Sequence, residues 1–201
     1  MKARKVTESA DNLEPMPGRP YSVCVYCGSS NDADPAYLDL ARRFGAAMAA
    51  RGWRLVYGGG RVGLMGAAAS AAHAAGGGVL GVMPNFLARR EIVYEAVEHR
   101  MVETMHERKA IMFDESDAFV ALPGGIGTLE EIVEVLSWRR LDLHQKPIIL
   151  CSEDDFWAPL FHLIDHTVMA KLTTQSFARS IVDARSMEDC FAVLEAARAA
   201  A

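Results

Sequence analysis

The chain has 201 residues, which favours a single domain, and 51% of them are hydrophobic, enough for a full core without disulfide or metal staples. The formal net charge is -5 and the basic residues are scattered, which argues against a nucleic-acid partner, because a phosphate backbone requires a clustered basic face. No run of about 18 apolar residues occurs, so we expect no membrane span.

Residues 1–20 are polar, contain three prolines and lack the apolar run of a secretion signal, so we expect a mobile tail there. The remaining residues, 21–201, then form one domain. Four cysteines in the whole chain indicate a reduced compartment without a disulfide framework, and we therefore expect a cytoplasmic protein.

Hydrophobic patterning predicts strands that alternate with helices along the chain. The strands are expected at residues 23–27, 54–57, 79–83, 97–102, 118–122, 147–151 and near 181. The helices are expected at residues 35–51, 64–75, 104–115, 128–141, 156–171 and at the C-terminus, whereas residues 85–95 look irregular. Asp34-Pro35 is a typical helix start, with Asp as the N-cap and Pro in the first turn.

The strands are continuous apolar runs, which indicates that both faces of the sheet are covered. The fold class is therefore α/β, a Rossmann-like doubly wound parallel sheet with helices on both faces. Ligands bind such sheets at the carboxyl ends of the strands. Those ends carry Gly28-Ser29-Ser30, Gly58-Gly59-Gly60 and Pro123-Gly124-Gly125.

Gly58, Gly60 and Gly63 match G-x-G-x-x-G between a strand and a helix. Such a loop can cradle a phosphate at a helix N-terminus, or it can be a tight structural turn. The dinucleotide-binding version requires an acidic residue about 20 positions further on. Met83-Pro84 occupies that place, which argues against NAD.

The segment from Pro123 to Glu131 also places glycines between a strand and a helix. It has no Walker lysine, which argues against ATP or GTP hydrolysis. Glu131 would repel a phosphate, so its use must lie elsewhere on a substrate. Alternatively, Thr128 and Glu131 form a capping box at the helix start, and the two roles can coexist.

Arg108 shares a helical stripe with Met105 and Met112, so its cation faces either solvent or a cleft. Metal ligands are not evident. Cys24 and Cys27 fall in a strand, where side chains three apart point to opposite faces, and His162 and His166 lack a third ligand. We therefore expect neither a metal nor another cofactor.

Three motifs together resemble the Lonely Guy family of cytokinin riboside 5'-monophosphate phosphoribohydrolases, which are often mislabelled lysine decarboxylases. They are the segments 58–66, 105–109 and 123–131, and the likeness runs from about Val23 to at least Asp165. The resemblance implies a nucleoside 5'-monophosphate substrate and the products free base and ribose 5-phosphate. It leaves open whether a prenylated cytokinin nucleotide or plain AMP is the physiological substrate.

The resemblance also implies roles for individual residues. Arg108 and Glu131 match the family's catalytic pair. The positions that match its substrate-binding residues are Glu91, Arg108, Lys109, Gly124, Gly125, Ile126, Gly127, Thr128, Leu129, Glu130 and Ser137. Cleavage of an N-glycosidic bond builds positive charge on the sugar. The Glu131 carboxylate could stabilise that charge, or it could deprotonate the attacking water. A guanidinium keeps its proton, so Arg108 is not expected to donate one. Its expected role is to orient or electrostatically stabilise the phosphate, Glu131 or the leaving base.

Two other functions are open to this sequence. A decarboxylase would need pyridoxal phosphate on a lysine, and no lysine after residue 20 has a suitable context. A non-catalytic nucleotide sensor of the same fold is the stronger alternative. The family likeness, together with a predicted apolar surface of Met101, Met105, Met112 and Phe113, further implies a homodimer.

Overall fold

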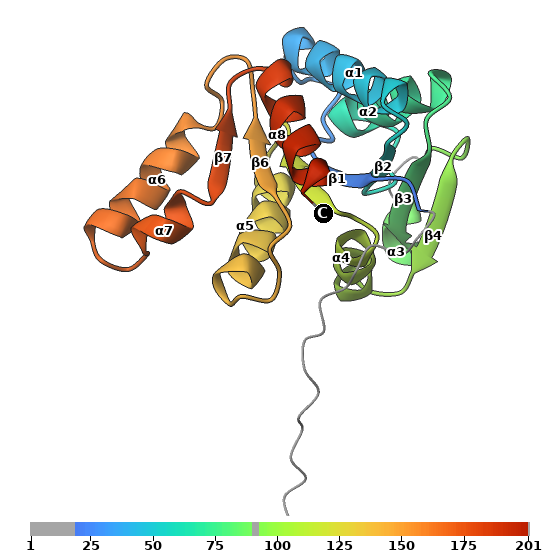
Figure 1. Cartoon of the computed structure of the whole chain (residues 1–201). Coiled ribbons are helices and arrows are strands. Elements are labelled where there is room, and N and C mark those ends of the chain that lie inside the picture. Colours follow the sequence, from blue (N-terminus) through green and yellow to red (C-terminus); the bar gives the residue numbers. More distant parts are fainter. Residues whose placement is uncertain (1–18, 90–92, 201) are drawn as a thin grey trace, which may run out of the picture.

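The fold, seen in a computed structural model that describes residues 19–89 and 93–200, is a parallel sheet between two layers of helices (Figure 1). In this part of the chain seven strands pair in the order β4-β3-β2-β1-β5-β6-β7, and every pair is parallel. The strands are β1 (Ser22–Tyr26), β2 (Arg54–Tyr57), β3 (Val79–Pro84), β4 (Glu98–Val102), β5 (Ala118–Ala121), β6 (Ile148–Cys151) and β7 (Ile181–Ala184).

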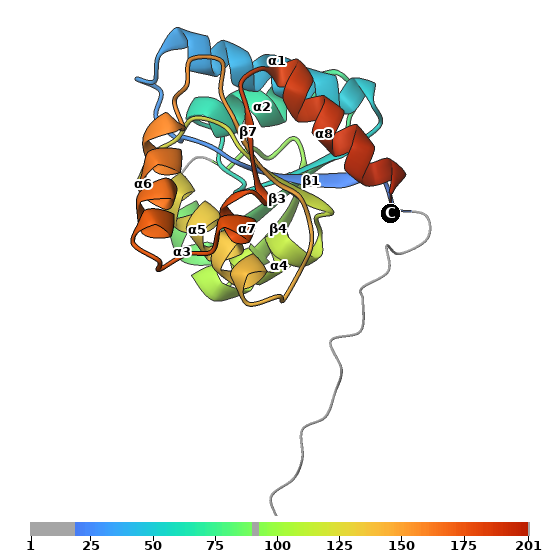
Figure 2. The ribbon, with the colours of Figure 1, turned by 60° about the vertical axis from the view of Figure 1, so that its left-hand side comes forward.

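Helices cover both faces of the sheet, as Figures 1 and 2 show. One face carries α1 (Pro35–Ala50), α2 (Gly63–Ala74) and α8 (Met187–Ala199). The other carries α4 (Met105–Asp114), α5 (Ile126–Arg140), α6 (Ala158–Met169) and α7 (Gln175–Ala178). This arrangement confirms the predicted Rossmann-like doubly wound fold. No helix in the two described ranges is long and apolar enough to cross a membrane.

The central strand β1 is buried along its whole length, and the four residues after Ser22 show which face of the sheet each side chain enters. Val23 and Val25 pack into the core beneath α1, α2 and α8, whereas Cys24 and Tyr26 pack into the core on the opposite face. All four are buried, so both faces of this part of the strand favour apolar side chains. Cys27, three residues after Cys24, belongs to the first core, which confirms that the two thiols lie on opposite faces.

The structure differs from the sequence prediction in three short segments. A helical turn, α3 (Asn85–Ala88), occupies part of the stretch expected to be irregular, and α7 was not predicted. Helix α5 begins at Ile126, with extended Gly125 as its N-cap, so Thr128 lies inside the first turn. The predicted capping box of Thr128 and Glu131 is therefore wrong, because α5 has no side-chain cap.

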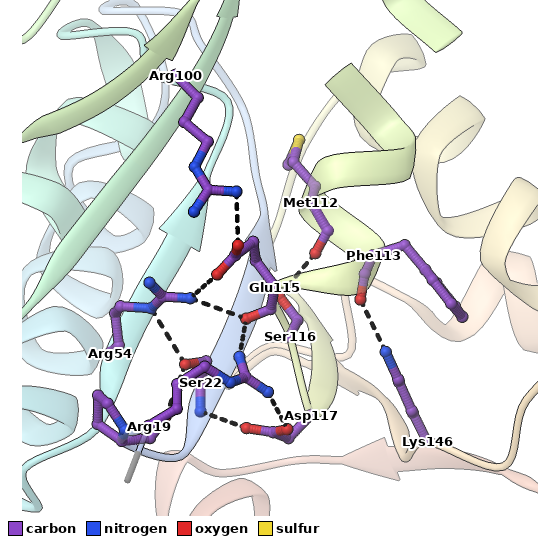
Figure 3. A network of polar contacts seen from close by, with 11 residues as sticks. Arg19, Ser22, Arg54, Arg100, Met112, Phe113, Glu115, Ser116, Asp117 and Lys146 are labelled. Carbon is purple, nitrogen blue, oxygen red and sulfur yellow. Dashed lines mark hydrogen bonds and ion pairs between the residues drawn. The ribbon is translucent and has the colours of Figure 1, made fainter. Parts of the chain in front are cut away.

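The amino ends of the strands are tied together by a network of charged groups (Figure 3). Glu115, just before β5, forms ion pairs with Arg54 and with Arg100, whose Nη1 lies 2.6 Å from the carboxylate. Arg19, which the sequence predicts within the tail, donates to the carbonyl of Glu115 and to Asp117. Asp117 also accepts from the amide of Ser22 at 2.8 Å. This network stabilises the amino ends of the strands. Such folds bind ligands at the opposite, carboxyl ends.

The predicted apolar surface around α4 is wrong in part. Met112 is fully buried, and Phe113 packs against the same core. Only Met101 among these residues is a largely exposed side chain, at 47%. These residues mainly stabilise the fold, so they do not support a subunit interface.

Candidate active site

The candidate site is a cavity of about 360 Å³ at the carboxyl ends of β1 and β5. The chain runs outward in opposite directions from these two neighbours, which makes this the switch point where doubly wound sheets bind ligands. The lining residues are Cys27, Gly28, Ser29, Ser30, Met65, Leu87, Arg108, Gly125, Ile126, Gly127, Thr128 and Glu131. A wider hollow between α6 and α7 is lined by no buried charged side chain.

The N-terminus of α5 opens into this cavity. Among the described residues, none accepts a hydrogen bond from the amides of Ile126, Gly127 or Thr128, and the first bonded amide is that of Leu129, which donates to the Gly125 carbonyl at 3.0 Å. A side chain at Gly125 or Gly127 would meet nothing within 4 Å, so open space lies in front of these amides. Free amides and the positive end of the helix dipole form a seat for an anion such as phosphate.

The N-terminus of α2, by contrast, is closed. The Gly63 amide donates to Asn31 Oδ1 at 2.9 Å, and the amides of Leu64 and Met65 both donate to the Gly28 carbonyl, at 2.9 and 3.2 Å. No amide of this turn remains for a ligand. Of the two interpretations of G-x-G-x-x-G, the structure therefore supports the structural turn.

Arg108 and Glu131 meet at the inner end of the cavity. Arg108 Nη1 lies 3.2 Å from Glu131 Oε1, and only 10% and 12% of the two side chains are exposed. Arg108 Nε also donates to the Val82 carbonyl at 3.1 Å, which fixes the guanidinium between α4, β3 and α5. The arginine therefore faces the cleft, and the solvent-facing alternative is wrong.

Burial raises the pKa of the Glu131 carboxyl to about 7, against the opposing charge of Arg108. The neighbouring Glu130 carboxylate adds to the rise. A carboxyl group that titrates near neutral pH can accept and release a proton under physiological conditions, as a general base requires.

The other predicted binding residues lie around the cavity or away from it. Lys109 Nζ contacts Glu130 at 2.6 Å and Glu134 at 2.9 Å; desolvation opposes its charge, but these two contacts prevail and raise its pKa. Neither Lys109 nor Glu130 lines the cavity.

Three further predicted positions, Gly124, Leu129 and Ser137, lie in α5 or just before it. Gly124 lies beneath its first turn, where a side chain would clash with Thr128 and with the Gly28 amide. Leu129 packs against the core on the face of the sheet that α4 to α7 cover. Ser137 is exposed nine residues after Thr128, which is about 14 Å along the helix, so this chain does not bring it to the cavity. Glu91 lies outside the described residues.

Several lining residues were not among the predicted binding positions. The loop after β1 contributes Cys27, Gly28, Ser29 and Ser30, and α2 contributes Met65. The sequence held one signal for the loop, because Gly28-Ser29-Ser30 follows the first strand. Leu87 on α3 gave no such signal.

The fold and cavity define the class: a Rossmann-like α/β protein with an open helix N-terminus and a buried carboxylate at its switch point. A family model described as "Possible lysine decarboxylase" matches residues 65–194. A cytokinin riboside 5'-monophosphate phosphoribohydrolase from Rhodococcoides fascians is 40% identical over 91% of this chain and 98% of its own length. One from Oryza sativa subsp. japonica is 44% identical over 86% of this chain and 72% of its own length. The chain belongs to this family, the Lonely Guy family.

Solved structures support the fold. A molybdenum cofactor binding protein from Rippkaea orientalis is 27% identical, with a TM-score of 0.67 over 89% of this chain and 98% of its own. The molybdenum cofactor carrier protein from Chlamydomonas reinhardtii has a TM-score of 0.68 at 23% identity, over 90% and 99% of the two chains. The second likeness concerns the fold alone.

Proposed function

We propose that this chain hydrolyses the N-glycosidic bond of a nucleoside 5'-monophosphate and releases the free base and ribose 5-phosphate. The observation that carries the proposal is the buried pair of Arg108 and Glu131 beside the open N-terminus of α5. The names of the relatives, which are phosphoribohydrolases of cytokinin riboside 5'-monophosphates, support the same activity.

The geometry suggests how the reaction proceeds. The 5'-phosphate binds the amides of Ile126, Gly127 and Thr128, which places the sugar one helical turn deeper, beside Glu131. As the bond from C1' to the base nitrogen breaks, the sugar develops positive charge that the carboxylate stabilises. Glu131 then accepts a proton from the water that attacks C1'. Arg108 holds the carboxylate in place. The leaving base takes up a proton from solvent and Glu131 afterwards returns the proton of the water to solvent, so that the net reaction adds OH to C1' and H to the base nitrogen.

We propose a cytokinin nucleotide or AMP as the substrate, since both present a purine riboside 5'-phosphate. Incubation with AMP, followed by chromatography of adenine and assay of ribose 5-phosphate, tests the activity. Equal amounts of both products are expected, and adenosine should be a far poorer substrate, because it lacks the group that binds α5. Binding of AMP without products would favour the non-catalytic nucleotide sensor instead.

We also propose a cytoplasmic homodimer. Cys24, Cys27, Cys151 and Cys190 are all free and buried, as expected in a reducing compartment. The support for a dimer comes from exposed apolar side chains on α5 and α6 and on the segments that follow them. These are Val133, Leu141, Leu143, Leu163, Met169 and Leu172, which are between 48% and 80% exposed.

A further inference from the structure

The loop after β1 is clamped between two neighbours. On one side, Asn31 Oδ1 and the Gly28 carbonyl accept all three bonds from the amides that begin α2. On the other side, the Gly28 amide donates to the Pro123 carbonyl at 3.0 Å, in the turn that leads into α5. The loop is therefore held beside the anion seat by the backbone of Gly28 at its start and by the side chain of Asn31 at its end.

Gly63 makes this clamp sterically close. Its φ of +62° is rare for residues with side chains, and an added Cβ would lie 2.5 Å from the Ser29 carbonyl carbon and 2.7 Å from the Ser30 amide nitrogen. The peptide that joins Ser29 to Ser30 thus rests directly on the first residue of α2. The hydrogen bond from the Gly63 amide to Asn31 Oδ1 therefore helps to set the position of this peptide.

Ser30 presents a hydroxyl donor to the cavity. Ser30 lines the cavity, and its Oγ accepts a hydrogen bond from the Asp32 amide at 3.1 Å. A serine hydroxyl has one donor hydrogen and two lone pairs, so the hydrogen remains available. A group with several acceptor oxygens, such as a phosphate, suits this donor.

The loop lies beside the phosphate seat. A Cβ on Gly28 would be 3.5 Å from Gly124 Cα, so the residues after Gly28 run alongside the turn that precedes the open amides of α5. Glu131, where the sugar binds, is a turn further along the helix. The 5'-phosphate is therefore the part of the substrate that meets Ser30.

We propose that Ser30 donates a hydrogen bond to the 5'-phosphate and that Asn31, by binding the Gly63 amide, is the residue that positions Ser30. This inference rests on the proposed function for its substrate. It adds one side-chain donor to the backbone amides of α5 that bind the phosphate. It also means that the glycine motif before α2 supports substrate binding indirectly, through Asn31 and Ser30.

Kinetics with AMP test Ser30. Ser30→Ala should raise KM about tenfold or more and change kcat much less, because a hydrogen bond to a charged group is lost from substrate and transition state alike. The melting temperature should not change, since the side chain is exposed. Ser176→Ala, an exposed serine on α7, is the control. An unchanged KM in Ser30→Ala would overturn the assignment.

Asn31 is tested by a pair of variants of similar size. Asn31→Leu removes the acceptor for the Gly63 amide and should raise KM as Ser30→Ala does, whereas Asn31→Asp keeps an Oδ1 acceptor and should recover most of the affinity. The double variant Ser30→Ala/Asn31→Leu should be little worse than either single variant. Equal KM values for Asn31→Leu and the unaltered protein, equal damage by Asp and Leu, or additive effects would each overturn the positioning role.

Calorimetric titration with ribose 5-phosphate and with ribose separates this inference from the proposed activity. Ser30→Ala should weaken binding of ribose 5-phosphate about tenfold and leave that of ribose unchanged. If the unaltered protein binds ribose 5-phosphate but never cleaves AMP, the hydrolase proposal fails while the titration still decides the role of Ser30. Equal binding of ribose 5-phosphate by both proteins would reject it.

Discussion

Gly58 leaves the space that the guanidinium of Arg108 occupies. A Cβ at this position would lie 2.0 Å from Arg108 Nη2 and 3.3 Å from Met65 Sδ. The first glycine of the motif after β2 therefore makes room for Arg108, which lies on a different element.

Gly58→Ala should displace Arg108 from Glu131 and lower kcat/KM roughly tenfold or more, since small displacements of positioned groups are costly. Gly78→Ala is the matched control, because a Cβ there meets only the Arg54 side chain, at 3.4 Å or more. Steady-state kinetics and thermal melting of both variants give the comparison. A fully active Gly58→Ala protein would show that the position of Arg108 is not critical.

Gly127 and Gly63 should respond in opposite ways to alanine. A Cβ on Gly127 meets nothing, and alanine favours a helix over glycine by about 1 kcal/mol, so Gly127→Ala should keep or raise the melting temperature. Its methyl group enters the cavity and should raise KM for AMP. Gly63→Ala should destabilise the protein, because its positive φ and the contact with Ser29 both oppose a side chain. An undisturbed KM in Gly127→Ala would argue against the phosphate seat at α5.

Light scattering at micromolar concentration should give a mass near twice 21.9 kDa. Replacement of Leu163 and Met169 by Lys should shift the mass toward that of a monomer, because both are exposed on α6 and a charge at an apolar interface is unfavourable. Ala196→Lys, exposed on α8 on the other face of the sheet, serves as the control for added charge. A mass near 22 kDa for the unaltered chain would reject the dimer.

The strands and the parallel sheet could be predicted because buried strands are apolar on both faces, and β1 is an example. Arg108 and Glu131 could be named as candidates from their motifs, but their approach to 3.2 Å depends on how α4 and α5 pack. Local sequence carries no sign that Asn31 binds Gly63, 32 positions later. For the same reason local sequence leaves two interpretations of the glycine motif before α2, and the bonded amides of Gly63, Leu64 and Met65 support the structural turn.

Glu131→Gln should separate catalysis from folding. Gln keeps the size of the side chain but neither accepts a proton nor carries charge, so turnover should fall by roughly 10²-fold or more while AMP affinity stays nearly intact. Because α5 has no capping box at Thr128, the substitution removes no cap. Adenine release and AMP titration are the measurements. An active Glu131→Gln enzyme would move the catalytic carboxylate to another residue, such as Glu130 or Glu91.

The pH dependence of activity and of stability should both report Glu131. Its pKa is about 7 in the folded protein against 4.5 for an ordinary glutamate, so kcat/KM should decline as pH falls below about 7 and the carboxylate becomes protonated. Stability follows the opposite sense, because the folded state holds the proton more tightly than the unfolded state does. The stabilisation is complete below about pH 4.5 and is lost as pH rises through 7. Glu131→Gln lacks this titration, so its melting temperature relative to that of the unaltered protein should rise between pH 5 and about pH 8. A constant difference across that range would place the ionisation of Glu131 outside it.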